Sequence, residues 1–375
     1  MSNIPMATAV MVDPSGKPPV TGGGSHDPFS MPPRRDSRYE QFVGNQGTNG
    51  KDYSRLYDFL NEHQWPRGLQ DNLIRSLDRL PIRFMIVDDS GSMSLPDGNK
   101  IVGTGNQSKL ITCTRWAELT TSMIFHAHLA EAAEAKTEFR LLNSLSPIML
   151  GLGGENDGVN FTKLVSHLKE SGPSGGTPLC KHIREVTQEI TEIADSLRAN
   201  GQKAVIVIAT DGESSDGDLL TAMRPLQSLP VWVVIKLCTD EDAVVNYWNN
   251  IDGQLELDID VLDDFSAEAS EVHENNKWLT YGLPLQRLRE FGTTLKEIDL
   301  LDETKLTSEQ IRSMVSVIFG GAKDDYPHPE VDPAAFEKAV KVKIDNELQT
   351  WCPLKKRMLP WVRIEKIRTG GCSIM

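Results

Sequence analysis

Hydrophobic and polar residues alternate along the middle of the chain in a pattern typical of an α/β protein. The runs Val205–Ile208 and Val231–Ile235 are apolar on both faces, as parallel strands covered by helices must be. Longer stretches between such runs carry apolar residues at helical spacing. We therefore predict a Rossmann-like, doubly wound and mostly parallel sheet, with helical extensions on its N-terminal and C-terminal sides.

The pattern predicts short strands separated by helices. Strands are expected at six places: 82–87, 137–142, 147–150, 204–209, 231–237 and 255–261. The second and third of these strands, joined by a short loop, should form an antiparallel hairpin at the sheet edge. Helices are expected at 114–135, 160–170, 179–199, 218–227, 241–250 and 266–275, and further along at 285–291, 308–319 and 333–342.

Changes in composition predict five segments. The first is rich in Pro, Gly, Ser and Asn, which predicts a disordered tail. The second carries two short helical patterns interrupted at Trp65-Pro66. The five segments are a disordered tail (1–51), a helical lead-in (52–80), the α/β domain (81–276), a helical extension (277–345) and a basic tail (346–375).

Three loops carry the side chains that suit a hard metal ion. Asp88-x-Ser90-x-Ser92 follows the first strand, Thr177 lies in a Gly-Gly-Thr-Pro loop, and Asp211 follows another buried strand. Carboxylates and hydroxyls are oxygen ligands that favour Mg²⁺, with Ca²⁺ and Mn²⁺ as alternatives, over zinc or copper. Ligands of open α/β sheets bind beyond the carboxyl ends of strands where the strand order reverses. We expect the three loops to converge there on one divalent cation.

The mixture of ligands also indicates what the ion would do. Three of the five side chains are neutral hydroxyls, which leave the charge of the cation largely uncancelled. Such an ion can accept one more carboxylate, supplied by another protein. We therefore expect a protein partner that presents an acidic side chain.

Asp88, Ser90, Ser92, Thr177 and Asp211 together resemble the metal-ion-dependent adhesion site of von Willebrand factor type A domains. The resemblance covers roughly residues 81–276 and implies a six-stranded Rossmann-like fold that binds Mg²⁺ and a protein ligand. The chain departs from the pattern in two places. Asp89 adds a carboxylate that would either raise cation affinity or repel an acidic ligand, and Leu95–Ser108 is a polar insertion beside the metal loops.

Two enzyme classes share part of this pattern. Phosphotransfer receiver domains also carry an acidic pair after a first strand, but no strand-terminal Asp follows at the interval they need. Haloacid-dehalogenase-type phosphatases require Asp-x-Asp, whereas Ser90 stands in the second place here, and no phosphate-binding Gly-rich loop is present. We expect a non-enzymatic protein. The alternative is a scaffold subunit that binds through helices 283–345 and keeps a vestigial metal site.

Other polar residues have simpler explanations. Glu256, Asp258 and Asp260 alternate with apolar residues, which predicts the solvent-exposed face of an outer strand. Asp216-Gly-Asp218 is expected to cap the next helix and not to form a calcium loop. His126 and His128 lie two residues apart on a predicted helix, so they cannot share a metal ion.

Charge and cysteine content limit the partners and the compartment. The chain has 39 Lys and Arg against 53 Asp and Glu, a net charge of −14, which argues against nucleic acid. Its five cysteines are widely spaced, as in a reducing compartment, and the first residues show no signal-peptide pattern. We expect a cytoplasmic protein.

The last residues match a prenylation pattern. Cys372 is followed by Ser-Ile-Met, a combination that favours attachment of a farnesyl group. One lipid chain binds membranes only marginally, and nearby basic residues strengthen the attachment to anionic lipid. Such residues precede the cysteine at Lys355, Lys356, Arg357, Arg363, Lys366 and Arg368. The sequence therefore predicts a protein held on the cytoplasmic face of a membrane.

Overall fold

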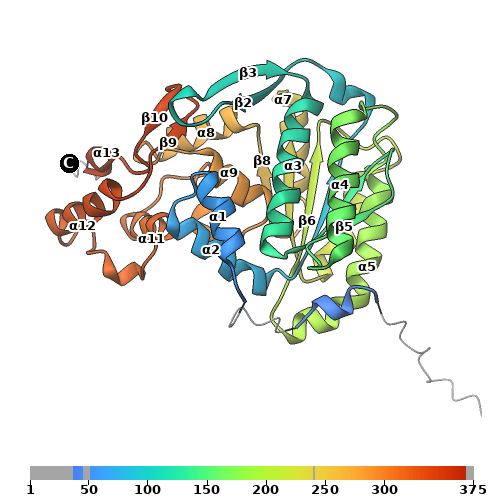
Figure 1. Ribbon diagram of the computed structural model, residues 1–375, viewed down its shortest axis with the longest axis horizontal. Coiled ribbons are helices and arrows are strands. Elements are labelled where there is room, and N and C mark those ends of the chain that lie inside the picture. Colours follow the sequence, from blue (N-terminus) through green and yellow to red (C-terminus); the bar gives the residue numbers. More distant parts are fainter. Residues whose placement is uncertain (1–36, 45–50, 240, 369–375) are drawn as a thin grey trace, which may run out of the picture. The chain divides into compact units, whose positions relative to one another are not determined.

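Six strands form the central sheet in the order β5-β4-β1-β6-β7-β8, seen in the computed structural model of the chain (Figure 1). Residues 37–44, 51–239 and 241–368 are described, and those from Ser37 onward belong to one compact unit. The strands are β1 (Ile82–Val87), β4 (Lys136–Leu141), β5 (Ile148–Leu150), β6 (Ala204–Thr210), β7 (Val231–Leu237) and β8 (Ile259–Leu262). β5 runs antiparallel to β4 and the other neighbours are parallel, so the predicted sheet and its edge hairpin are confirmed.

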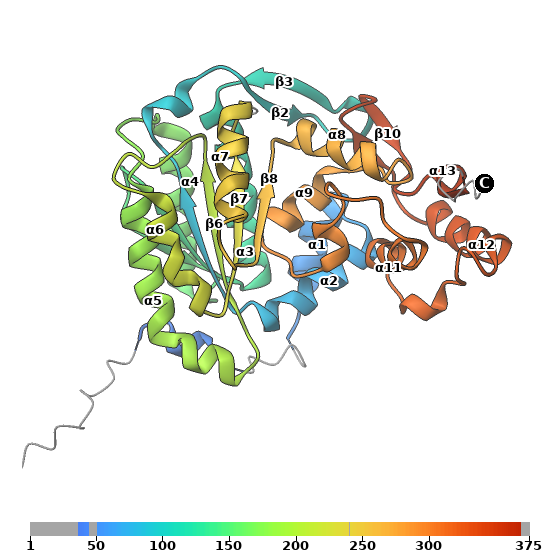
Figure 2. The same cartoon turned by 180° about the vertical axis from the view of Figure 1, so that it is seen from behind.

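Helices cover both faces of this sheet, as the strands' two apolar faces require. Met85 and Val87 of β1 belong to one hydrophobic core, and Phe84 and Ile86 belong to the other. Figure 1 shows α3 (Arg115–Ala133) and α4 (Glu155–Glu170) on the first face. Figure 2 shows α5 (Leu179–Ala199), α6 (Leu219–Met223), η4 (Arg224–Ser228) and α7 (Asp242–Asp252) on the opposite face. The fold is a doubly wound α/β sheet.

The N-terminal lead-in forms two helices, α1 (Ser54–Glu62) and α2 (Arg67–Arg79), separated at Trp65-Pro66 as predicted. The expectation of disorder up to residue 51 is wrong for residues 37–44. They include the turn η1 (Glu40–Phe42), and the Tyr39 ring is 1% exposed and lies 5.3 Å from the Phe84 ring. Tyr39 anchors the segment together with its neighbours, since Phe42 packs against the same core and Arg38 pairs with Glu138 at 2.9 Å. Residues 1–36 and 45–50 lie outside the described ranges.

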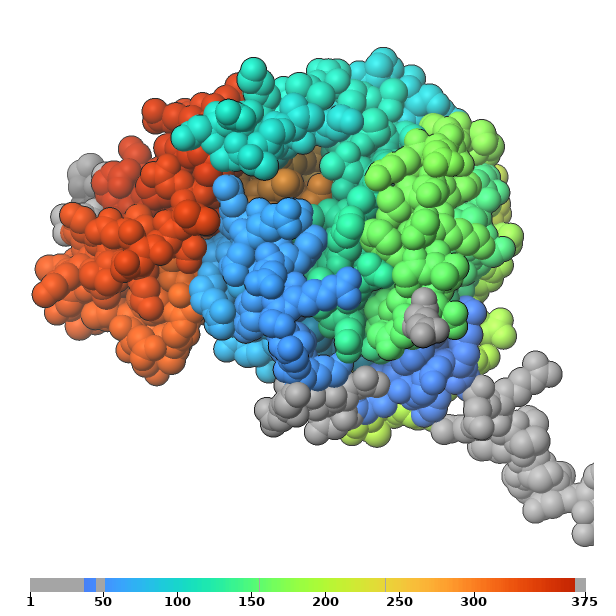
Figure 3. Space-filling view, in the orientation of Figure 1, coloured from blue at the N-terminus to red at the C-terminus, as the bar shows by residue number. Residues whose placement is uncertain are grey.

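The polar insertion after β1 contributes a hairpin of its own. Following the turn η2 (Gly91–Ser94), β2 (Gly98–Val102) pairs antiparallel with β3 (Lys109–Cys113), and η3 (Gly105–Gln107) joins them. The η3 turn contacts two C-terminal strands, β9 (Thr350–Cys352) and β10 (Arg357–Leu359). Figure 3 shows the cyan hairpin meeting the red C-terminal region. The insertion therefore spans from the end of β1 to the C-terminal part of the fold.

The outer strand β8 differs from its prediction. The predicted strand 255–261 is replaced by Ile259–Leu262, and only Glu256 and Asp258 are exposed. Asp260 is 5% exposed, so its assignment to the solvent-exposed face is wrong. Its carboxylate accepts a hydrogen bond of 2.7 Å from Arg289, which lies on a C-terminal helix. Alternation along one strand predicts which residues share a face, but the packing of a distant helix decided which face is buried.

The C-terminal extension packs against the same hydrophobic core as α3. Gly68 of α2 makes this close packing possible, because a Cβ atom there would lie 2.3 Å from the backbone nitrogen of Gly320. Trp351 and Trp361 are buried, so residues 350–368 form packed structure rather than a free tail. The remaining elements are α8 (Phe265–Asn275), α9 (Leu283–Glu290), α10 (Lys296–Asp299), α11 (Ser308–Phe319), η5 (Lys323–Asp325), α12 (Pro333–Asp345) and α13 (Ile364–Arg368). Among the described helices, none has the length and apolarity needed to cross a membrane.

Candidate functional site

The first predicted ligand, Asp88, lies at the carboxyl end of β1 and is fully buried. One of its carboxylate oxygens accepts a hydrogen bond from the Ser90 backbone N–H at 2.9 Å, and the other accepts one from the Thr210 hydroxyl at 2.6 Å. Burial raises the pKa of Asp88, although these hydrogen bonds act in the opposite direction. Thr210 ends β6, so the two central strands hold the Asp88 carboxylate in a set orientation.

A chain of oxygen atoms leads from this loop to the end of β6. The hydroxyl oxygens of Ser90 and Ser92 lie 3.0 Å apart, and the Ser92 hydroxyl donates to Asp211 Oδ1 at 2.9 Å. Asp211 is 4% exposed. Because β1 and β6 are neighbours in the sheet, the loops that follow them meet. The structure brings together four of the five predicted side chains.

The third loop approaches through its backbone. The Gly91 N–H donates to Gly175 O at 3.1 Å, and the Ser174 N–H donates to Asp89 O at 2.7 Å. Gly175 has φ = +90°, a conformation that a residue without a Cβ adopts readily. Within the described part of the chain, the hydrogen bonds of Thr177 run through its backbone to the loop after β6. Thr177 therefore lies in the loop that packs on the site, and no hydrogen bond there joins its hydroxyl to the other four side chains.

Asp89, the extra carboxylate of the motif, is turned away from this chain of oxygens. Its side chain accepts hydrogen bonds from the Asn143 backbone and side chain at 2.8 and 3.0 Å, and also from the Ser144 hydroxyl. It is 1% exposed. These contacts give Asp89 a structural part, joining the loop after β1 to the loop after β4.

Arg115 is the residue at this site that the sequence pattern did not indicate. It starts α3, is 2% exposed, and donates from Nη1 to Asp211 Oδ2 at 3.0 Å. Its other nitrogens donate to Asp97 at 2.8 and 2.5 Å and to Glu241 at 2.6 Å. Asp211 and Glu241 are 96 and 126 positions away along the chain, so no local motif could reveal these pairs.

The donor set fits a hard divalent cation. Asp88 and Asp211 supply carboxylates and Ser90 and Ser92 supply hydroxyls, with Thr177 on the adjoining loop. The guanidinium already held against Asp211 shows that this position accommodates positive charge. The Ser92 hydrogen is directed at Asp211, which leaves lone pairs of that hydroxyl for an ion.

A second acidic group lies away from the predicted site. Carboxylate atoms of Glu268, Glu271 and Asp302 lie within 4.8 Å of one another. Arg289 forms ion pairs with Glu268 and, at 3.1 Å, with Asp302. A guanidinium therefore already compensates two of these three carboxylates.

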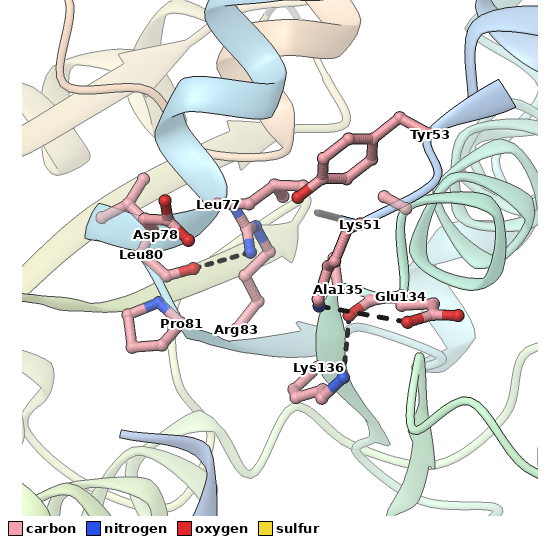
Figure 4. A pocket seen from close by; sticks show the side chains of 11 residues that line it. Lys51, Tyr53, Leu77, Asp78, Leu80, Pro81, Arg83, Glu134, Ala135 and Lys136 are labelled. Carbon is pink, nitrogen blue, oxygen red and sulfur yellow. Dashed lines mark hydrogen bonds and ion pairs between the residues drawn. The ribbon is translucent and has the colours of Figure 1, made fainter. Parts of the chain in front are cut away.

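A small cavity lined partly by basic side chains lies near the amino end of β1. Figure 4 shows a cavity of about 30 Å³ lined by Lys51, Tyr53, Arg83 and Lys136, among others. Arg83 donates to Leu80 O at 2.9 Å, and its Nη2 atom has no partner within the described residues. Burial lowers the pKa of Arg83 to about 9. The cavity has room for one or two water molecules, which suffices to satisfy that nitrogen.

Comparisons with known proteins give partial structural likenesses. No family model and no curated protein matches the chain. The VWA domain of SpRpn10 is 14% identical, with a TM-score of 0.30, over 48% of this chain and 86% of that domain. BatB from Bacteroides thetaiotaomicron is 15% identical, with a TM-score of 0.28, over 42% of this chain. The matched part spans 65% of the BatB chain. At these values the likenesses carry no further conclusion, and the sheet order with its two helical layers shows a doubly wound α/β fold.

Proposed function

We propose that this chain is a protein-binding module that acts through a divalent cation. The preferred ion is Mg²⁺, bound by the loops that follow the carboxyl ends of β1 and β6. The observation that carries the proposal is the convergence of four oxygen-bearing side chains: buried Asp88, Ser90 and Asp211, with the exposed Ser92 hydroxyl between Ser90 and Asp211. Thr177 would supply a fifth oxygen from the neighbouring loop. With few charged ligands the ion would accept a carboxylate from a partner protein. We further propose that the site turns over no substrate.

Calorimetric titration with Mg²⁺ and Mn²⁺ tests the cation site. The wild-type chain should bind one ion, and Asp88→Ala should bind none while remaining folded, because the Asp88 carboxylate lies in a loop beyond the strand. Glu256→Ala, a change at an exposed carboxylate far along the chain, is the matched control and should bind as the wild type does. Equal Mg²⁺ affinity in Asp88→Ala and the wild type would contradict the assignment.

Capture of a partner tests the role of the ion. Pull-downs from lysate are compared in Mg²⁺ and in chelator, with Thr177→Ala as a variant that removes the Thr177 hydroxyl together with its methyl group. The proposal predicts that chelator abolishes capture and that Thr177→Ala weakens it. Capture that survives both changes would mean that the ion plays no part in recognition.

A scaffold subunit with a vestigial metal site is the second candidate. The ion pair between Arg115 and Asp211 favours it, because a guanidinium already uses one oxygen of a predicted ligand. Its predicted binding surface included α9, whose residues from Pro284 to Glu290 are all buried. Any such surface must therefore lie in the rest of the range, from α10 to α12, and binding through it would be independent of metal.

We also propose that Cys372 is farnesylated when Met375 forms the carboxyl end, so that the protein binds the cytoplasmic face of a membrane. Cys372 lies outside the described residues. Lys355 and Lys356, in the turn between β9 and β10, and Arg357, at the start of β10, are exposed and can approach anionic lipid. Intact-mass measurement of protein from a eukaryotic host should show the added lipid and the loss of Ser-Ile-Met. An unmodified mass would contradict this proposal, and Cys372→Ser should leave the protein unbound to vesicles of anionic lipid.

A further inference from the structure

Arg115 is a fixed positive charge built into the predicted metal site. Its side chain is 3% exposed and forms ion pairs with Asp97 at 2.5 Å, Glu241 at 2.6 Å and Asp211 at 3.0 Å. The hydrogen bonds that Arg115 donates to Asp97, with those to Glu241 and Asp211, outweigh the effect of burial and raise the pKa of Arg115 further above its ordinary value. The guanidinium is therefore charged at every physiological pH.

Both carboxylate oxygens of Asp211 already have partners. Oδ1 accepts from Ser92 and Oδ2 accepts from Arg115. A divalent ion placed against Asp211 would share this carboxylate with the guanidinium, and the two cations would repel each other. Arg115 therefore acts directly on the affinity of the site for a metal ion.

The other partners of Arg115 lie at the surface. The side chains of Asp97 and Glu241 are 41% and 56% exposed, whereas that of Asp211 is 2% exposed. They belong to two further loops, one before β2 and one at the start of α7. These partners can retain the guanidinium when its contact with Asp211 weakens. With Asp88 included, the cluster has four carboxylates and one guanidinium, so negative charge remains to attract a cation.

We propose that Arg115 is an internal counter-cation that competes with the divalent ion for Asp211 and thereby sets the metal affinity of the site. In the metal-free chain it holds the loops of Asp97, Asp211 and Glu241 together. When an ion binds, the guanidinium gives up Asp211 and keeps its two surface partners. The inference rests on the proposed function, in which the ion binds at Asp88 and Asp211.

The test is calorimetric titration of the full chain with Mg²⁺ and with Mn²⁺, for the wild type, Arg115→Gln and Arg115→Lys. Removal of one positive charge next to the ion should tighten binding by about tenfold or more in Arg115→Gln. Arg115→Lys keeps the charge and should stay within about threefold of the wild type. In chelator, Arg115→Gln should unfold at a lower temperature than the wild type, and Mg²⁺ should raise its Tm by more.

Equal or weaker binding in a folded Arg115→Gln chain would overturn the inference, because it would mean that Arg115 only holds Asp211 in position. Absence of ion binding in the wild type and in all variants would overturn the proposed function, and the inference with it. The two failures are thus distinguishable.

A second variant tests the same competition without removing the buried guanidinium. Asp97→Asn takes away an exposed partner, so Arg115 should hold Asp211 more firmly and Mg²⁺ affinity should fall. Asp242→Asn is the matched control, because it removes the same charge from an exposed residue next to Glu241. Asp97→Asn should weaken Mg²⁺ binding more than Asp242→Asn does, and equal losses in the two variants would contradict the competition.

Discussion

Helix α3 joins two groups of buried charges that differ in balance and in access to solvent. The first group lies at the start of α3 and is called here the metal-face cluster. It comprises Arg115 and the carboxylates of Asp88, Asp97, Asp211 and Glu241. Three of the four carboxylates there pair with the one guanidinium, and two of those three reach the surface. Further along the same helix, the side chains of Ser122 and His126 contact Glu290 of α9.

The second group, the α9 cluster, comprises His126, Lys236, Arg287 and Glu290. Glu290 is 1% exposed and pairs with Arg287 at 2.5 Å and with Lys236 and His126 at 2.9 Å each. Burial opposes ionisation of Glu290, but Arg287 and Lys236 more than offset it and hold its pKa well below the ordinary value. The α9 cluster is buried, and its two cations, Lys236 and Arg287, outnumber its one carboxylate.

The two clusters differ in net charge and in solvent exposure, and this difference indicates different roles. A buried cluster in which cations outnumber carboxylates does not attract a metal cation, and its ion pairs instead join α9 to α3 and β7. The metal-face cluster has an excess of acid and an opening to solvent, which is the arrangement that attracts a cation. A buried charge therefore indicates a function only when the net charge of its cluster and the exposure of that cluster to solvent are also known.

The largest effect is expected from the α9 cluster. Glu290→Gln leaves Lys236 and Arg287 buried without their carboxylate, and should lower the free energy of unfolding by about 3–5 kcal/mol. Denaturant unfolding measures this loss. Glu256→Gln, at an exposed carboxylate, should change stability by less than about 0.5 kcal/mol. A loss below about 1 kcal/mol in Glu290→Gln would mean that the α9 cluster does not stabilise the fold as described.

The effect of Mg²⁺ on stability should distinguish variants of the metal-face cluster from variants of the α9 cluster. A ligand at about 100 times its dissociation constant stabilises the folded state by about 2.7 kcal/mol. We expect Mg²⁺ to raise the free energy of unfolding by an amount of this order in the wild type and by the same amount in Glu290→Gln. In Asp88→Ala, Mg²⁺ should not change it. Denaturant unfolding of the three proteins with and without Mg²⁺ gives the comparison. An increment lost in Glu290→Gln would show that the two clusters are coupled through α3.

The smallest effect concerns pH and the acidic residues beside α9. Burial, reinforced by the negative charge of Asp260, raises the pKa of Asp299 from 3.8 to about 7. Between these values the folded chain keeps a proton that the unfolded chain has lost, so stability falls as pH rises through this range. Asp299→Asn should lessen this fall and raise the Tm at pH 8 by about 2–4 °C, with little change at pH 4.

Thermal unfolding between pH 4 and pH 8 measures the effect, and Asp58→Asn, at an exposed position, serves as the control. An identical pH dependence of Tm in Asp299→Asn and the wild type would contradict the assignment. Because Asp299 is only half-buried, its effect should be smaller than that of Glu290.

The local sequence determined the elements of the sheet and the position of the metal loops. Apolar runs with period two or with no polar face specify strands, and a residue that directly follows a strand must lie at its carboxyl end. Asp88 and Asp211 could therefore be assigned to one edge of the sheet from pattern alone, and their loops do meet there. The two helices before β1 and the cap at Asp218 were predictable for the same reason, since both depend on neighbours within a few residues.

Tertiary structure decided which charges are paired and which faces are covered. Arg115 contacts Asp211 and Glu241 across 96 and 126 residues, and Arg289 covers Asp260 across 29. Tyr39 anchors a segment whose composition predicts disorder, through contacts with Phe84 and with Glu138 99 residues away. Electrostatic pairing has no period along the chain, because it depends on distances that exist only after distant elements have packed. The sequence by itself thus determined which side chains lie at the carboxyl ends of β1 and β6, and only the fold placed a guanidinium against Asp211.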